Sequence, residues 1–190
     1  MKKNLITAVL MTIATTILLG IIYPLLVTAL AQVFFKDKAN GEIVRRNGEA
    51  IGSRLIAQPF TADKYFHPRP SAAGTGYDAA NSGGTNFAPT NEKLIDRVRT
   101  DAAALHQQNP SETIPVDLIT TSASGLDPDI SPAAADFQVP RVARARGVSE
   151  QAILDLVRKH TAQRDLGLLG EPRVNVLELN LALDSAFPKP

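Results

Sequence analysis

The sequence contains no cysteine among its 190 residues. This absence excludes a disulfide scaffold, a cysteine zinc site and a thiol nucleophile. A surplus of either charge is also lacking, because the formal net charge is +1 at pH 7, and nothing therefore indicates binding to nucleic acid. The folded part of the chain must be stabilised by burial of apolar groups or by docking on a partner.

Charge is missing altogether from residues 4–35. An α-helix rises about 1.5 Å per residue, so about 20 apolar residues cross a bilayer core of about 30 Å. We predict a membrane-spanning helix whose threonine hydroxyls bond to carbonyls one turn earlier and which tolerates its proline. The positions assigned to the span are Thr7, Leu10, Ile13, Ile17, Gly20, Tyr23, Pro24, Val27 and Leu30.

A cleaved secretory signal is the alternative interpretation of the same segment. Lys2 and Lys3 would form its basic region, and Ala29-Leu30-Ala31 would form its cleavage site. The apolar stretches of signal peptides run about 7–15 residues, and the run from Leu5 to Ala31 is nearly twice as long. Length favours a retained span over an exported binding protein that is released after Ala31.

The charges beside the span predict its orientation. Lys2 and Lys3 precede it closely and place the N-terminus in the cytoplasm, although Lys36 and Lys38 follow it. We therefore predict a transmembrane helix with a short cytoplasmic N-terminus over residues 1–35 and an extracytoplasmic domain over residues 36–190. That domain is long enough for one hydrophobic core, and 18 Lys and Arg residues stand in it against 19 Asp and Glu.

The patterns after residue 36 predict a single α+β domain. Asn47-Gly48 indicates a hairpin whose return strand extends to Phe60. Apolar spacing predicts helices over residues 91–107, 132–146 and from 149 onward, with Ser131 as a cap, Gly147 as a stop and Pro140 as an interruption. Further strands are expected over 116–121 and 174–177, and a short last helix over 180–187.

A loop of about thirty residues occupies positions 59–91 and is rich in proline, glycine and asparagine. Its aromatic residues argue against disorder, so we expect an ordered binding surface. Aromatic and arginine side chains commonly dominate interface energies, and the candidate partner contacts are Tyr65, Phe66, Arg69, Tyr77 and Asn81. In the alternative, Phe66 and Tyr77 only fix the loop to its own domain.

Catalytic and metal motifs are lacking. Residues 74–79 match a loose dinucleotide fingerprint, but no strand precedes them and no helix pattern follows. Asp127 and Asp129 have the spacing of a calcium loop, yet Pro132 stands where that loop needs glycine. A group of arginines is either a solvated helix end or an anion site, and its members are Arg141, Arg144, Arg146 and Arg173.

Several long strings carry a resemblance to a known family. They are YFHPRPS at 65–71, YDAANSGG at 77–84, TSASGLDP at 121–128, ISPAAA at 130–135, RVARARG at 141–147, GEPRVNVL at 170–177 and LNLALD at 179–184. Together with the N-terminal span, the chain resembles the C subunit of the Kdp potassium-transporting ATPase over essentially its whole length. Thr85 and Pro140 depart from the family pattern, and Pro140 interrupts a helix that the family leaves unbroken.

The resemblance implies a non-catalytic accessory subunit of an ATP-driven potassium uptake complex in the bacterial inner membrane. Its partners would be a channel-like potassium-translocating subunit, a P-type ATPase subunit and a small single-span subunit, besides the lipid bilayer. The family is described as a catalytic chaperone that raises the ATP affinity of the pump subunit. An extracytoplasmic domain would meet little ATP, so we expect any contact with ATP to pass through the pump subunit.

The phosphorylation motif of a P-type pump, Asp-Lys-Thr-Gly-Thr, is absent from this chain. Its first two residues occur at Asp37-Lys38 and Asp63-Lys64, but Ala39 and Tyr65 follow. The chain is therefore not expected to hydrolyse ATP by itself, and no bound cofactor or metal is predicted.

Overall fold

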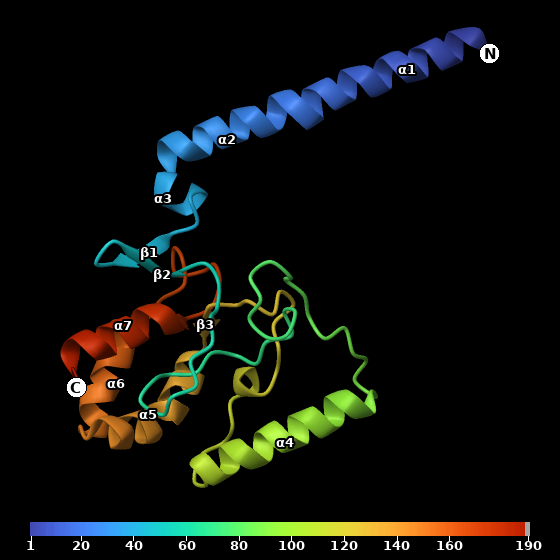
Figure 1. Cartoon of the computed structure of the whole chain (residues 1–190). Coiled ribbons are helices and arrows are strands. Elements are labelled where there is room, and N and C mark those ends of the chain that lie inside the picture. Colours follow the sequence, from blue (N-terminus) through green and yellow to red (C-terminus); the bar gives the residue numbers. More distant parts are fainter. Residues whose placement is uncertain (189–190) are drawn as a thin grey trace. The chain divides into compact units, whose positions relative to one another are not determined.

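The computed structural model describes residues 1–188, so Pro190, where the predicted extracytoplasmic domain ends, lies outside the described residues. The chain divides into two compact units, Met1–Ala50 and Ile51–Pro190. The first carries a long apolar helix, and the second combines helices with a small sheet (Figure 1). The predicted fold class, one N-terminal helix and a single α+β domain, is confirmed.

The first unit is dominated by an unbroken helix over Lys2–Phe34, which is long and apolar enough to cross a membrane by length and composition. It consists of α1 (Lys2–Ile17), a π-helical segment η1 (Leu18–Ile22) and α2 (Tyr23–Phe34). Its threonine hydroxyls donate to carbonyls one turn earlier, as predicted: Thr7 to Lys3, Thr12 to Ala8 and Thr15 to Met11, at 2.8–3.0 Å.

The π-helical segment accommodates Pro24. Proline lacks a backbone N–H and normally leaves a carbonyl of the preceding turn without a donor. Here Tyr23 donates its N–H five residues back, to the carbonyl of Leu18, so the helix widens just before the proline and continues beyond it. Local widening of this kind allows an apolar helix to carry a proline without ending.

A short helix α3 (Lys36–Ala39) leads to strands β1 (Ile43–Arg46) and β2 (Glu49–Ser53), which form a two-stranded sheet. Asn47 and Gly48 both have positive φ, 53° and 86°, as a two-residue hairpin turn requires, so this prediction is confirmed. The extension of the strand to Phe60 is wrong, because β2 ends at Ser53. The Ser53 hydroxyl accepts a hydrogen bond from the Leu55 N–H at 3.1 Å, and the chain turns there.

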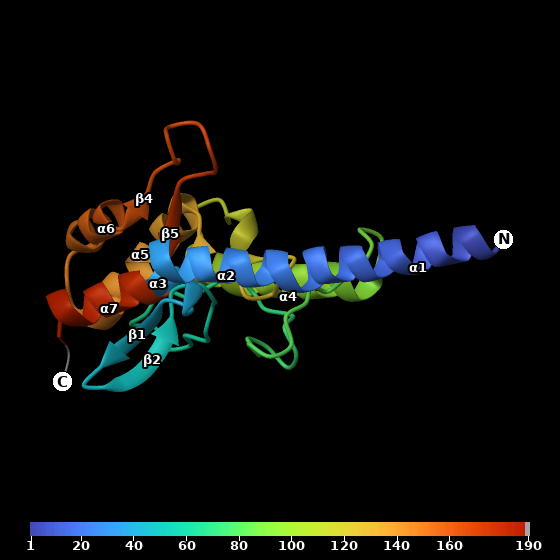
Figure 2. The ribbon, with the colours of Figure 1, turned by 90° about the horizontal axis from the view of Figure 1, so that it is seen from above.

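The second unit contains three core helices, α5 (Pro132–Arg146), α6 (Glu150–Lys159) and α7 (Val176–Ala186). Strands β3 (Asp129–Ile130), β4 (Thr161–Ala162) and β5 (Arg173–Asn175) form an antiparallel sheet with β5 in the middle. Helix α4 (Glu92–Gln108) has no buried residue along its described length. Figure 2 shows the connection between β4 and β5 projecting from this unit.

Most helix starts follow local sequence signals. The side chains of Asn91, Ser131 and Ser149 accept N–H groups of α4, α5 and α6, and Gly147 ends α5 with φ 69°. Pro140 does not interrupt α5, which runs through it. The interruption that the sequence suggests is therefore wrong.

Two strand predictions are also wrong. Residues 116–118 form a 3-10 turn, η2 (Val116–Leu118), instead of a strand. The strand expected over 174–177 ends at Asn175, because the Asn175 side chain accepts the Glu178 N–H and starts α7 at Val176, earlier than the predicted residue 180.

The N-terminal helix generates a prediction about association in lipid. A Cβ at Gly20 would meet only Thr16 Cγ2 among nearby atoms of the described chain, at 3.9 Å, so leucine fits there within the helix itself. Helices associate in membranes through small residues that allow close packing. Gly20→Leu should therefore reduce copurification of the chain with the membrane partners that its resemblance implies, whereas Leu19→Ile should not. Equal recovery of both variants would contradict a role for Gly20 in helix packing.

Candidate interaction surface: the ordered loop and its anchors

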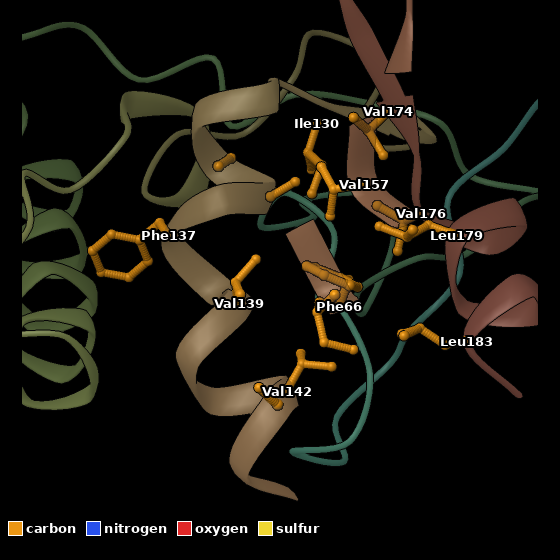
Figure 3. Close-up of a cluster of buried hydrophobic side chains, with 14 of the residues drawn as sticks. Phe66, Ile130, Phe137, Val139, Val142, Val157, Val174, Val176, Leu179 and Leu183 are labelled. Atoms are coloured by element: carbon orange, nitrogen blue, oxygen red, sulfur yellow. The ribbon is translucent and has the colours of Figure 1, made fainter. Parts of the chain in front are cut away.

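The first half of the long loop is fixed to the core of the second unit at Phe66. Phe66 is 0 % exposed and lies among apolar side chains of α5, α7 and the strands (Figure 3). Its backbone N–H donates to Asn180 Oδ1 at 2.8 Å, and its carbonyl accepts from Asn180 Nδ2 at 2.9 Å. The Asn180 side chain on α7 thus forms hydrogen bonds with both backbone groups of Phe66, as a neighbouring strand would do.

Gln138 on α5 clamps the next residue in the same way. The His67 N–H donates to Gln138 Oε1 at 2.8 Å, and Gln138 Nε2 donates to the His67 carbonyl at 3.1 Å. Burial lowers the pKa of His67, and the Arg141 guanidinium lowers that pKa further. The imidazole is therefore neutral at pH 7, which suits its place beside a buried cation.

Arg141, one turn further along α5, holds the start of the segment. Its Nη1 donates to the carbonyls of Asp63 and Tyr65 at 2.6 and 2.9 Å, and its Nη2 donates to Gln138 Oε1 at 2.7 Å. Burial lowers the pKa of Arg141 to about 10, so the group stays charged at neutral pH. Nη1 and Nη2 of this guanidinium are thus engaged by the chain itself, whereas its buried Nε has no partner in the described chain.

Arg146 joins the loop to the end of α7. Its Nε donates to the Lys64 carbonyl at 2.8 Å, and its Nη2 donates to Asp184 Oδ1 at 2.8 Å. The other oxygen of Asp184 accepts the Tyr65 hydroxyl at 3.0 Å, and the guanidinium lies 5.2 Å from the centre of the Tyr65 ring. Burial and the bond to Asp184 raise the pKa of Tyr65. This network fixes the Tyr65 ring against the domain.

The second half of the loop is pinned by Arg69 and Tyr77. Arg69 Nη1 pairs with Asp127 Oδ2 at 2.9 Å, and its Nε donates to the Thr120 carbonyl at 3.4 Å. The Tyr77 hydroxyl donates to the Arg69 carbonyl at 2.8 Å, and burial raises the pKa of Tyr77 to about 12. Where the loop passes Gly125 (φ 66°), a Cβ would lie 2.5 Å from the Gly83 carbonyl oxygen, so glycine is required there.

The five residues predicted as partner contacts thus lie in different environments. Phe66 is in the core, and Tyr65, Arg69 and Tyr77 are partly exposed and bonded within the domain. Asn81 is exposed, and its Nδ2 donates to Asp78 Oδ2 at 2.6 Å. The exposed residues of the loop are 59, 61–63, 74–76, 79–82 and 86–90, and Phe87 among them is 40 % exposed.

The four arginines grouped in the sequence do not form one cluster. Arg141 and Arg146 are buried against the loop, and Arg144 on the same helix is exposed. Arg173 lies on β5 and pairs with Asp129 at 3.3 Å. Among the described residues, no group of three or more His, Asp or Glu side chains is placed to hold a metal ion. The site is therefore built for holding a chain segment.

Sequence reasoning missed the amide anchors Gln138 and Asn180. Both are polar residues at positions of a helix that otherwise reads as apolar, and both are almost fully buried, at 2 % and 1 % exposure. A polar residue on the apolar face of a helix is the signal that could have found them, since buried polar groups need partners.

Known proteins match this chain over nearly its full length. The family model of the K+-transporting ATPase c chain (KdpC) matches residues 5–185. The potassium-transporting ATPase KdpC subunit of Koribacter versatilis is 67 % identical over 190 residues, covering 100 % of this chain and 98 % of that protein. The KdpC subunit of Rhodopseudomonas palustris strain BisB18 is 56 % identical over 198 residues, covering 98 % and 100 %. The chain belongs to the family of K+-transporting ATPase c chains.

The anchoring network predicts unequal effects for two arginines of α5. Arg141→Ala leaves two loop carbonyls and the Gln138 oxygen without their charged donor, so we expect a loss of about 3 kcal/mol in the free energy of unfolding. That corresponds to a melting temperature lower by about 6–12 °C for a domain of this size. Arg144→Ala, at an exposed position three residues away, should change stability by less than about 1 kcal/mol.

Circular dichroism on the detergent-solubilised full chain measures both melting temperatures. If Arg141→Ala and Arg144→Ala have the same melting temperature, the stability of the domain does not depend on the bonds from Arg141 to the loop.

Proposed function

We propose that the chain is the accessory, non-enzymatic subunit of an ATP-driven potassium uptake complex. The observation that carries this proposal is the whole-length family match, which includes the apolar helix, the loop and its anchors. The site geometry supports it, because the buried arginines and amides bond to the chain's own backbone and so hold the loop. The chemistry of ATP hydrolysis then belongs to the partners.

The membrane helix tethers the domain in this proposal. The N-terminus lies in the cytoplasm, the helix spans the bacterial inner membrane, and residues 36–190 lie outside the cytoplasm. The partners are a channel-like potassium-translocating subunit, a P-type ATPase subunit and a small single-span subunit. An influence on the ATP affinity of the pump, as the family description has it, would then act through subunit contacts.

The loop serves as the contact surface of the domain. Phe66, Tyr65, Arg69 and Tyr77 fix its course, and the exposed stretch around Asn81 faces the partner. A loop without regular structure but with its backbone fixed loses little entropy on binding, and this preorganisation favours tight association. Residues 79–82 and Phe87 are the candidate contacts in this arrangement.

The competing function is an autonomous exported binding protein released after Ala31. The mass of the mature chain, purified from its native membrane, separates the two. A chain that retains residues 1–35 and copurifies with ATPase subunits supports the accessory subunit. A mature chain beginning at Gln32 would overturn it.

The orientation of the domain is tested by reporter fusions placed after the last residue of the sequence. A reporter active only outside the cytoplasm should give activity, and a reporter active only inside should give none, because Lys2 and Lys3 hold the N-terminus inside. The reverse pattern would place the domain in the cytoplasm and make direct contact with ATP a reasonable expectation.

Two loop variants distinguish residues that contact a partner from residues that only fix the loop to its own domain. Asn81→Ala should leave the melting temperature unchanged, because Asn81 is exposed, and should lower potassium-stimulated ATP hydrolysis by the assembled complex. Arg69→Ala removes a partly buried ion pair, so it should lower the melting temperature by about 2–6 °C. Unchanged hydrolysis with Asn81→Ala and Phe87→Ser would exclude this stretch as the contact surface.

A further inference from the structure

The connection between β4 and β5 presents three leucines to solvent. Leu166, Leu168 and Leu169 are 91 %, 83 % and 62 % exposed, and the first two exceed every other large apolar side chain described in the second unit. Figure 2 shows this connection as a narrow projection between β4 and β5. Single exposed apolar residues are ordinary on protein surfaces, but three within four residues at a protruding tip form a patch.

The tip is held rigidly by its own backbone. Asp165 and Leu169 exchange both of their N–H···O bonds, at 2.8 and 2.9 Å, and the Gly167 N–H donates to the Arg164 carbonyl at 3.1 Å. An ion pair between Arg164 and Glu171 closes the base of the hairpin. The backbone that carries the leucines is therefore held in one arrangement, and little backbone entropy is lost when they bind.

Leu166 occupies a backbone conformation that does not suit leucine. Its φ is 54°, in the left-handed region where glycine or asparagine is favoured and a bulky side chain is strained. Its side chain is almost fully exposed, so burial within the chain does not compensate for that strain. Strained residues that contribute nothing to their own core are typical of functional surfaces. The leucine therefore suits a contact outside the chain.

The charges at the tip argue against a lipid surface. Residues that dock on bilayers are rich in Lys, Arg, Trp and Tyr. Residues 163–171 contain no aromatic residue and a single basic residue, Arg164, which is paired with Glu171. Asp165 adds a further negative charge beside the leucines, and anionic lipid headgroups would repel it.

A second copy of the chain is also disfavoured as the occupant. Three leucine side chains on each of two tips bury far less than the roughly 1,200 Å² of a stable protein interface. A small convex apolar knob instead fits a pocket, where a few well-buried side chains dominate the binding energy of a larger interface. We propose that the leucine tip, residues 164–171, inserts into an apolar pocket of another subunit of the potassium-transporting complex. This proposal rests on the proposed function.

Variants of the tip test its contribution to assembly. Leu166→Gly relieves the strained φ and removes the knob, and Leu168→Ser removes its neighbour without affecting any apolar contact in the core. Each should leave the melting temperature of the full chain equal or higher, and should speed its dissociation from the purified complex about tenfold or more. Leu55→Ser, at a 45 % exposed leucine elsewhere in the domain, is the matched control and should dissociate at the wild-type rate. Equal dissociation rates for all three variants would overturn the proposal.

A single probe identifies what covers the tip. The chain has no cysteine, so Leu168→Cys provides one labelling position, and an unsubstituted complex corrects for cysteines of the other subunits. A bimane label at this position, in the complex reconstituted in lipid nanodiscs, should be shielded from aqueous iodide and from doxyl-labelled lipid alike. Quenching by doxyl lipid would assign the tip to the bilayer, and quenching by iodide would leave it in solvent. Either result would overturn the proposal.

Two different results would contradict the accessory role and the docking of the leucine tip. If the wild-type chain does not copurify with ATPase subunits at all, the proposed function fails. If the wild-type chain copurifies but the tip variants dissociate at its rate, the accessory role stands and only the leucine tip is excluded.

Discussion

The loop at residues 63–67, which places Phe66 in the core, is the constraint on which the rest of the domain depends. An irregular chain segment against a core carries N–H and C=O groups that no strand neighbour satisfies, and leaving them unpaired is costly. Here side chains replace the missing strands: Asn180 and Gln138 each bond to both backbone groups of one residue, and Arg141 and Arg146 bond to the carbonyls before them. Helices α5 and α7 must therefore carry polar groups on the faces that they bury.

This arrangement explains how a long loop without regular structure is ordered. Burial of the Phe66 side chain favours placing the segment against the core. The amide and guanidinium groups form the hydrogen bonds that its backbone needs there. Asp184 then connects Arg146 to the Tyr65 hydroxyl, so the last helix, the loop and α5 are coupled through one carboxylate. Removing any member leaves another buried group without its partner, and such networks act as a unit.

Features encoded by neighbouring residues could be read from the sequence, and features that depend on distant residues could not. The hairpin at Asn47-Gly48 and the caps at Asn91, Ser131 and Ser149 follow from local chemistry. Val116 and its neighbours look like a strand but form a 3-10 turn, and β3 pairs instead with β5, more than forty residues later in the chain. The amide clamps join residues 71 and 114 positions apart, a separation at which local patterns carry no information. The charges of Arg141 and Arg146 are visible in the sequence, but most of their partners are backbone carbonyls, which leave no trace in a sequence.

The direction of the polar groups constrains what the domain can do. Gln138, Asn180, Arg141 and Arg146 point inward and hold the loop, while Arg141 Nε and two nitrogens of Arg97 are buried without a partner in the part of the chain that the structure describes. Exposed apolar groups lie on the N-terminal helix and at the leucines of the β4–β5 tip. Apolar surface in contact with water is favourably buried, whether in lipid or against another protein. A domain that uses most of its buried polar groups to hold its own loop and leaves apolar groups uncovered is suited to association with another surface.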